Sequence, residues 1–359
     1  MPGAVAACLR AAFGRSGFVL MISALLVAAC APPDAIVGTQ SPATATGLPG
    51  TVLTGSHEDG ATPSLPPASV PIPSDSGETG TPPAEGTLSV RTNVPYATAD
   101  KCGRREAVCQ QFVDIYSPSG ISGAPVVVMF HGRPRTPEDM AALATATAER
   151  GAVVFNADYR GVRPSRQKGF PDAVNDAACA IRYARAHAAE YGGDPSWLVV
   201  VGHSYGGYVG AETSLAGDEF DGECLVPDEA GSTWVDAYVG IDANCCIDHP
   251  TSHIWTTFFG GDRDDAAKNW RTGDPMYWLE HPSSSANRDL LVRMFHLRDD
   301  PVIGIDQPQD FVKALKTEGF DAKLVAMDGD HHLAPLKPSK PSFRAALDVI
   351  QEMLDARGS

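Results

Sequence analysis

The chain has 359 residues and a formal net charge of −16, from 44 acidic and 28 basic side chains. This length accommodates one large domain with appended segments. The excess of negative charge repels nucleic acid and anionic lipid head groups, which argues against a nucleic-acid partner.

The first 29 residues are expected to be an export signal rather than part of the fold. Arg10 and Arg15 form a basic start, and residues 18–29 are an uncharged, largely apolar run that is too short to favour a stable membrane span. The run ends in small residues directly before Cys30, which resembles the bacterial lipobox. The sequence therefore predicts an exported lipoprotein, anchored to the cell membrane by acyl chains on Cys30, with its folded domain outside the cytoplasm. An ordinary secretory signal cut near Ala29 is the alternative.

Residues 30–87 are expected to form a disordered linker. Residues 31–86 hold eleven prolines, many Ser, Thr and Gly residues, and no Lys, Arg or aromatic residue. Such a segment cannot bury enough apolar surface to offset its ordering entropy. We therefore expect an extended spacer followed by one folded domain over residues 88–359.

Six of the eight cysteines remain once the signal is removed and Cys30 is acylated. In an exported protein this even number predicts disulfides, and Cys102 and Cys109 are the pair expected to bond. The adjacent Cys245 and Cys246 are expected to bond to two different partners rather than to each other. No C-x-x-C spacing occurs, so no metal site is expected. The two remaining cysteines are Cys179 and Cys224.

From residue 88 onward, apolar runs typical of strands alternate with Ala-rich or amphipathic stretches typical of helices. This alternation predicts an α/β fold, in which right-handed crossovers build a mostly parallel central sheet of about eight strands with helices on both faces. The expected strands are 88–96, 110–116, 126–130, 152–156, 197–201, 235–241, 290–297 and 322–327. The expected helices are 137–150, 171–191, 205–215, 307–318 and 342–354.

The strand at 197–201 runs directly into Gly202-His203-Ser204-Tyr205-Gly206-Gly207. A Gly-x-Ser-x-Gly sequence between a strand and a helix lifts the serine out of the sheet on a sharp turn. The flanking glycines allow the strand and the helix to approach each other closely. The pattern predicts Ser204 as a catalytic nucleophile, which needs a base to take its proton and an acid to orient that base.

The orienting acid is expected after a late strand. The strand at 290–297 leads into Asp299-Asp300, and Asp300 is predicted to be the acid, with Asp299 as its alternative. Asp242 ends an earlier strand and is a further alternative.

The base is expected in the loop after the last strand, which holds His331 and His332. One of these rings should present Nε2 to Ser204 while the acid accepts from Nδ1–H. His331 is favoured over His332.

Backbone N–H groups should stabilise the oxyanion that develops on the substrate. One is expected from Tyr205, at the start of the helix after the serine. The other is expected from Arg133, because Gly132 before it lets the backbone turn toward the pocket. His131 is expected to be structural rather than catalytic.

The order and spacing of these pieces resemble the α/β-hydrolase superfamily, nearest its carboxylesterase and lipase branch and of dienelactone-hydrolase-like size. The resemblance covers about residues 93–332. Besides the nucleophile turn and Asp300 with its following Pro-Val, it includes Asn93-Val94-Pro95-Tyr96, Phe112-Val113-Asp114-Ile115-Tyr116-Ser117-Pro118, Phe130-His131-Gly132, Asn156-Ala157-Asp158-Tyr159-Arg160, Phe170-Pro171-Asp172-Ala173 and Asp194-Pro195.

The resemblance implies an α/β-hydrolase fold with a cap insertion near residues 243–289, where some aromatic side chains should line an apolar pocket. It also implies a serine hydrolase that cleaves small-molecule carboxylic esters through an acyl-enzyme, without a cofactor. A peptidase of the same fold and a non-catalytic surface lipoprotein are the alternatives. Asp248, His249 and His253, in the cap, have a loose metal-ligand character that is not expected to bind metal.

Overall fold

The computed structural model describes residues 87–99, 109–133, 135–161, 169–226, 231–247 and 252–358. The expected export signal, the lipidation site at Cys30 and the linker lie outside these residues. Cys102, the expected partner of Cys109, also lies outside them. The same holds for Asp248 and His249, two of the three cap residues with a loose metal-ligand character.

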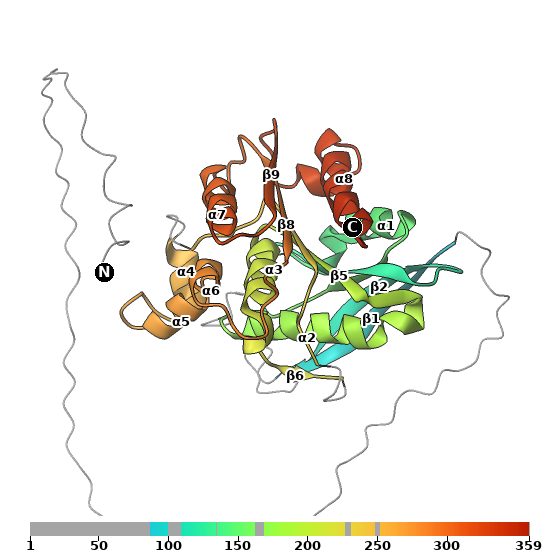
Figure 1. The fold of residues 1–359 in the computed structure, drawn as a ribbon, viewed down its shortest axis with the longest axis horizontal. Coiled ribbons are helices and arrows are strands. Elements are labelled where there is room, and N and C mark those ends of the chain that lie inside the picture. Colours follow the sequence, from blue (N-terminus) through green and yellow to red (C-terminus); the bar gives the residue numbers. More distant parts are fainter. Residues whose placement is uncertain are drawn as a thin grey trace, which may run out of the picture. The chain divides into compact units, whose positions relative to one another are not determined.

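A nine-stranded sheet organises the described residues (Figure 1). Its strands are β1 (Leu88–Ala99), β2 (Cys109–Pro118), β3 (Ala124–Phe130), β4 (Val153–Ala157), β5 (Gly193–His203), β6 (Glu223–Cys224), β7 (Ala237–Ile241), β8 (Leu291–Leu297) and β9 (Ala322–Met327). Their order across the sheet is β6-β1-β2-β4-β3-β5-β7-β8-β9. The pairs from β4 to β9 are parallel, whereas β6, β1, β2 and β4 pair antiparallel. The prediction of a mostly parallel sheet is therefore confirmed, and the short edge strand β6 is an addition to the expected set.

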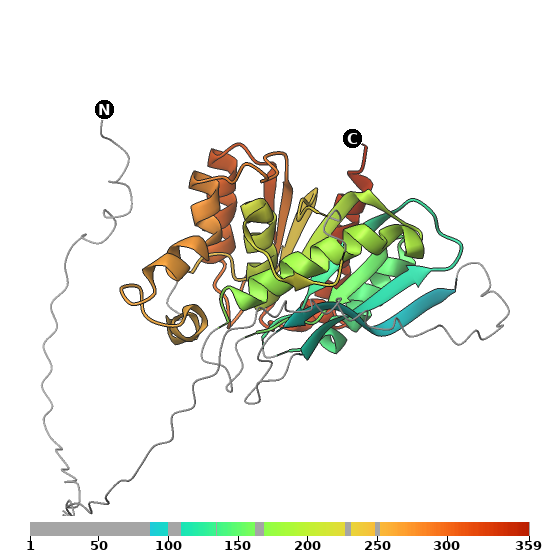
Figure 2. The same cartoon turned by 90° about the horizontal axis from the view of Figure 1, so that it is seen from below.

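Helices cover both faces of this sheet (Figures 1 and 2). Along β3, Val126, Val128 and Phe130 face one apolar cluster, while Val127 and Met129 face the other. A strand buried on both faces has no solvent side, which explains its uninterrupted apolar run. The first cluster includes α2 (Asp172–His187), α3 (Tyr205–Ala216) and α7 (Asp306–Thr317), and the second includes α1 (Ala141–Glu149) and α8 (Pro341–Asp355).

Two expected helices begin or end in a tighter turn. The helix expected over 137–150 starts as a 3-10 turn at Pro137–Asp139 before α1. The helix expected over 171–191 is α2 followed by a 3-10 turn at Ala188–Tyr191. It stops at Gly192, whose φ of 83° is in the left-handed region that glycine adopts readily.

The predicted cap segment contains α4 (Ser252–Phe259), α5 (Ala267–Thr272) and α6 (Pro275–Glu280). Trp255 and Phe258 are buried and pack against the rings of Tyr205 and Tyr208 on α3. These aromatic side chains fix the cap segment to the helix that follows Ser204.

One disulfide joins Cys179 on α2 to Cys224 on β6. Cys245 and Cys246 are both buried and unbonded, with their Sγ atoms 3.8 Å apart. The prediction that these two bond to different partners is wrong, because both are free thiols. None of the helices within the described ranges is long and apolar enough to cross a membrane.

Candidate active site

Ser204 lies on a strained turn between β5 and α3. Its φ of 55° and ψ of −121° place it outside the regions that side chains usually adopt. A Cβ on Gly202 would lie 2.3 Å from the carbonyl oxygen of Gly206, and one on Gly206 would lie 2.2 Å from that of Phe130. Only glycine fits at either position, so the sequence around Ser204 follows from the sharp turn that presents the hydroxyl at the carboxyl end of the parallel strands.

His332 and Asp300 meet beside this turn. The ring Nδ1 of His332 lies 2.6 Å from Oδ2 of Asp300, a short distance typical of charge-assisted hydrogen bonds. The loops after β9 and β8 carry the two residues, because parallel neighbouring strands end at the same edge of the sheet. The other ring nitrogen of His332, Nε2, is buried and has no hydrogen-bond partner. An imidazole held at Nδ1 and open at Nε2 is suited to accept a proton from a hydroxyl.

The preference for His331 over His332 is not supported by this geometry. The side chain of His331 is exposed, and its Nδ1 accepts a hydrogen bond from the backbone N–H of Leu333 at 3.2 Å. The carbonyl of His331 also accepts from Ala334 N–H. The loop therefore turns at His331, and this turn directs the next residue, the alternative His332, toward Asp300.

Asp300 is a buried carboxylate with several hydrogen-bond donors. Its Oδ1 accepts from the backbone N–H groups of Val302 at 2.7 Å and Ile303 at 3.2 Å, while Oδ2 pairs with His332. Burial alone would raise the pKa of Asp300, but the hydrogen bond and charge of His332 and the two backbone donors bring it below its usual value. Asp300 is therefore ionised at neutral pH.

The two alternative acids are placed differently. Asp299 is exposed, and its backbone N–H donates to Gly329. Asp242 is fully buried, and its Oδ1 accepts from the backbone N–H of Leu297 at 2.8 Å. Among these three carboxyl groups, Asp300 is the one hydrogen-bonded to a histidine ring, and it occupies the predicted orienting position.

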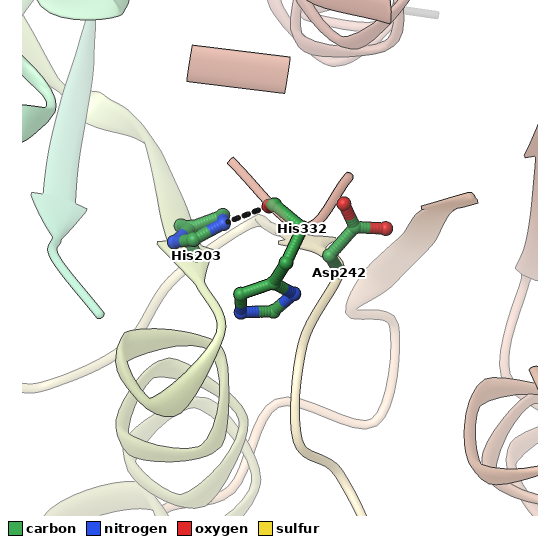
Figure 3. A group of neighbouring side chains, drawn as sticks. All are labelled: His203, Asp242 and His332. Atoms are coloured by element: carbon green, nitrogen blue, oxygen red, sulfur yellow. Dashed lines mark hydrogen bonds between the residues drawn. The ribbon is translucent and has the colours of Figure 1, made fainter. Parts of the chain in front are cut away.

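His203, which precedes Ser204, is hydrogen-bonded to the loop that carries His332, a contact that was not predicted from the sequence. Its Nε2 donates to the carbonyl of His332 at 3.0 Å, and the two rings lie 4.8 Å apart (Figure 3). Burial lowers the pKa of His203 to about 3, and the neighbouring His332 contributes in the same direction. His203 is therefore a neutral imidazole that ties the base loop to the nucleophile turn.

The predicted oxyanion-hole residues gather around Ser204. Tyr205 is the first residue of α3, and the first N–H groups of a helix have no acceptor within it. A Cβ at Gly132 would lie 3.0 Å from Cβ of Ser204, so the backbone leading to Arg133 passes beside Ser204. His131 is buried, with Nε2 3.0 Å from the carboxylate of Asp158. That position is consistent with the structural role predicted for His131.

A cavity of about 370 Å³ opens over these groups. Ser204, His203 and His332 line it, together with Arg133 and Arg135 from the loop after β3. No described residue from 243–289 is among its lining residues, so the expectation that cap aromatics line the pocket is not met there. The remaining lining residues are Gly132, Pro301, Val302, Asp330, His331 and Leu333.

Two groups of side chains within the described ranges have metal-like spacing. They are His203, Asp242 and His332, shown in Figure 3, and Asp242, His296 and Asp300. In each group the candidate ligand atoms lie within 4.8 Å of one another. Both groups include a residue of the His332–Asp300 pair, whose close hydrogen bond already uses one nitrogen and one oxygen. We therefore interpret them as a hydrogen-bonded cluster of the candidate site rather than a metal centre.

Sequence comparisons relate the chain to named esterases. Residues 113–315 match the family model BD-FAE. Over 202 residues the chain is 26% identical to the probable isoprenylcysteine alpha-carbonyl methylesterase ICMEL1 of Arabidopsis thaliana, covering 52% of this chain and 40% of that protein. Over 120 residues it is 33% identical to carboxylesterase NlhH of Mycobacterium tuberculosis, covering 32% of this chain and 36% of that protein. The chain thus spans about half or less of the length of the curated relatives it matches.

Solved structures share the architecture. The apo form of Thermogutta terrifontis esterase 2 superposes with a TM-score of 0.57 at 22% identity, over 77% of this chain and 97% of that one. A truncated carbohydrate esterase from gut microbiota superposes with a TM-score of 0.59 at 20% identity, over 77% of this chain and all of that one. At this identity the likeness concerns the fold, and it confirms the predicted α/β-hydrolase fold.

Proposed function

The chain belongs to the BD-FAE family, whose model matches more than half of its residues, and from this premise we propose that it is a serine hydrolase of carboxylic esters. The relatives and structural neighbours described above are all named as esterases of one kind or another. The observation that carries the proposal is that Ser204 and His332 line one cavity, with His332 hydrogen-bonded to Asp300 at Nδ1 and open at Nε2.

The first half of the reaction forms an acyl-enzyme. Nε2 of His332 takes the proton of Ser204 as Oγ attacks the ester carbonyl carbon and the carbonyl π electrons move to its oxygen. The N–H groups of Tyr205 and Arg133 stabilise this oxyanion. When the oxyanion collapses, the ester C–O bond breaks and the imidazolium of His332 returns its proton to the departing alcohol. Asp300 keeps the imidazole in the correct tautomer and stabilises its charged form.

The second half releases the acid. Water attacks the acyl carbon while His332 takes its proton, and collapse of the second oxyanion breaks the bond to Ser204 Oγ, which regains a proton from His332. The strained backbone at Ser204 keeps the hydroxyl exposed to the cavity throughout. No step requires a bound metal or an organic cofactor.

The test is hydrolysis of p-nitrophenyl acetate and butyrate by the purified chain and by Ser204→Ala. The matched control is Ser196→Ala, an exposed serine at the opposite end of β5. The proposal predicts ester turnover that falls at least about 10³-fold in Ser204→Ala and is unchanged in the control. Equal turnover in both variants would remove Ser204 from the mechanism. A strong preference for aminoacyl p-nitroanilides would favour the peptidase alternative, and no turnover of either substrate would favour a binding protein.

We also propose that the chain is exported and that lipid on Cys30 tethers the domain to a membrane. The support is the basic start, the apolar run and the small residues before Cys30. Radiolabelled palmitate should enter the wild type and not Cys30→Ala, whose domain should leave the membrane fraction. Equal labelling of both would contradict the proposal.

A further inference from the structure

Asp242 is a second buried carboxyl group next to the catalytic pair. It follows β7 directly, whereas Asp300 lies in the loop after the neighbouring strand β8, which ends at Leu297. The φ of 40° at Asp242 is unusual for a residue with a side chain. It is fully buried, and its Oδ2 has no hydrogen-bond partner. The mechanism above gives this residue no task, although Figure 3 shows it beside His332.

Hydrogen-bond donors are divided unequally between the two carboxyl groups. Asp300 accepts from two backbone N–H groups and from His332, whereas Asp242 accepts from the backbone N–H of Leu297. One oxygen of each group lies within 4.8 Å of the other. Two buried carboxyl groups this close do not both ionise readily, and the charge goes to the group with more donors. Asp300 therefore carries the charge and Asp242 the proton.

The neighbouring His296 supports the same assignment. Its Nε2 lies 2.9 Å from the carbonyl of Ile303 and must donate to it, so in the neutral ring Nδ1 has a lone pair. That Nδ1 lies 3.6 Å from Oδ1 of Asp242 and has no hydrogen-bond partner. The distance is longer than that of a charge-assisted pair, which fits two neutral groups. A protonated Asp242 places less negative charge against the lone pair of His296 Nδ1 than a carboxylate would.

His296 also links Asp242 to the acid loop. Ile303, whose carbonyl accepts from His296, donates its own N–H to Asp300. The contacts therefore run from Asp242 through the His296 ring to the backbone that fixes the catalytic carboxylate. Both Asp242 and His296 are fully buried, so no solvent competes for these contacts.

We propose that Asp242 is a positioning residue that acts in its protonated form: through His296 it holds the loop carrying Asp300, and as a neutral group it keeps a second negative charge away from His332. This rests on the proposed esterase function, because His332 and Asp300 are taken as its base and acid. The titratable groups that face Asp242 are His296 on β8, Asp300 after β8, His332 after β9 and His203 at the end of β5.

The electrostatics agree with the geometry. Burial raises the pKa of Asp242 to about 8, opposed by the Leu297 hydrogen bond and reinforced by the charge of Asp300. Burial lowers the pKa of His296. Asp242 is therefore protonated and His296 neutral through the neutral range, and Asp242 ionises as the pH rises through about 8.

The activity test compares kcat and kcat/KM from pH 6 to 10 in the wild type, Asp242→Asn and Asp242→Leu. Asn reproduces the neutral carboxyl and should keep kcat within about 3-fold at pH 7, whereas Leu removes the contact with His296 and should lower kcat at least about 10-fold with KM little changed.

The wild type should lose activity as the pH rises through about 8, and Asp242→Asn should not. Asp299→Asn is the control for loss of a nearby exposed carboxylate, and should keep the wild-type profile. A loss above 10-fold in Asp242→Asn at pH 7, or an alkaline fall equal to that of the wild type, would overturn the proposal.

A second measurement does not depend on turnover or on the folding of Asp242→Leu. The pKa of His332 is measured by NMR of the ring nitrogens in the wild type and in Asp242→Asn, with the signal assigned through His332→Gln. It should be the same in both proteins, because a protonated Asp242 and an asparagine place the same charge beside His332. A value lower by about one pH unit or more in Asp242→Asn would show that Asp242 is charged and would overturn the proposal. If Ser204→Ala retained full esterase activity, the function would fail while this measurement still decided the protonation of Asp242.

Discussion

The ends of β7 and β8 carry carboxyl groups in opposite states. Asp300, at the end of β8, receives three hydrogen bonds and is ionised, whereas Asp242, at the end of β7, receives one and is held as the acid. Both are buried in the same part of the molecule. Burial raises the pKa of both carboxyl groups, and the hydrogen bonds from His332 and two backbone N–H groups are what keep Asp300 charged.

The largest effect on activity is expected at His332, the histidine that is hydrogen-bonded to Asp300. Replacement of His332 by Ala should lower kcat/KM about 10⁴-fold, because the base and its orientation are lost together. Replacement of the adjacent, exposed His331 should change it by less than about 3-fold. Steady-state kinetics on p-nitrophenyl butyrate measure both. A larger loss in His331→Ala than in His332→Ala would reverse the assignment of the base.

The second largest effect on activity is expected when the ionised carboxylate of Asp300 is replaced by a neutral amide. Asp300→Asn should lower kcat about 10³-fold, because an amide NH₂ facing Nδ1 favours the wrong tautomer of His332. The same change at Asp242 preserves its native charge state and should cost little. Parallel kinetics at pH 7 compare the two variants directly. Equal losses in both would show that the two carboxyl groups do not differ in charge.

Stability should show the same difference as a function of pH. An acid whose pKa rises on folding, here from 3.8 to about 8, binds its proton more tightly in the folded state. Its stabilising contribution is complete below the unfolded pKa and is lost progressively as the pH rises toward the folded pKa. Asp242→Asn removes this dependence. As the pH rises from 4 to 8, the free energy of unfolding of the variant should therefore increase by roughly a few kcal/mol relative to that of the wild type. Urea unfolding at several pH values measures the difference, and a constant difference between the two proteins would contradict it.

The smallest effect on activity is expected at His203, which links the turn that carries Ser204 to the loop that carries His332. His203→Ala removes the hydrogen bond from Nε2 to the carbonyl of His332 and should lower kcat about 10-fold, with KM little changed. His203→Gln, whose amide can donate to the same carbonyl, should recover part of that loss. An equal loss in both variants would mean that the ring fills space rather than positions the base loop.

Local sequence determined much of this architecture, because the deciding features are local. The apolar run before Gly202 and the glycines around Ser204 predict the strand, the turn and the nucleophile, since any Cβ at Gly202 or Gly206 would collide with backbone. Asp300 follows from its place after a buried strand. The alternation of strands and helices predicts the sheet and the helices on both of its faces.

Features that depend on side-chain direction or on distant partners were not predictable. His331 and His332 are adjacent and chemically identical, and the choice depends on a turn in the loop that local propensity does not encode. The strand β6 has two residues and pairs with β1 next to the Cys179–Cys224 disulfide. The protonation of Asp242 depends on donors from β8, which lie more than fifty residues away in the sequence.

The central claim is that Ser204, activated by His332, is the nucleophile. The most direct measurement is peptide mapping by mass spectrometry after reaction with a fluorophosphonate, which reports the modified residue and the rate of modification. The account predicts an adduct on Ser204 in the wild type and in His331→Ala at similar rates, and modification slowed at least about 100-fold in His332→Ala. An adduct on another residue, no adduct in the wild type, or equal rates in His332→Ala and the wild type would contradict it.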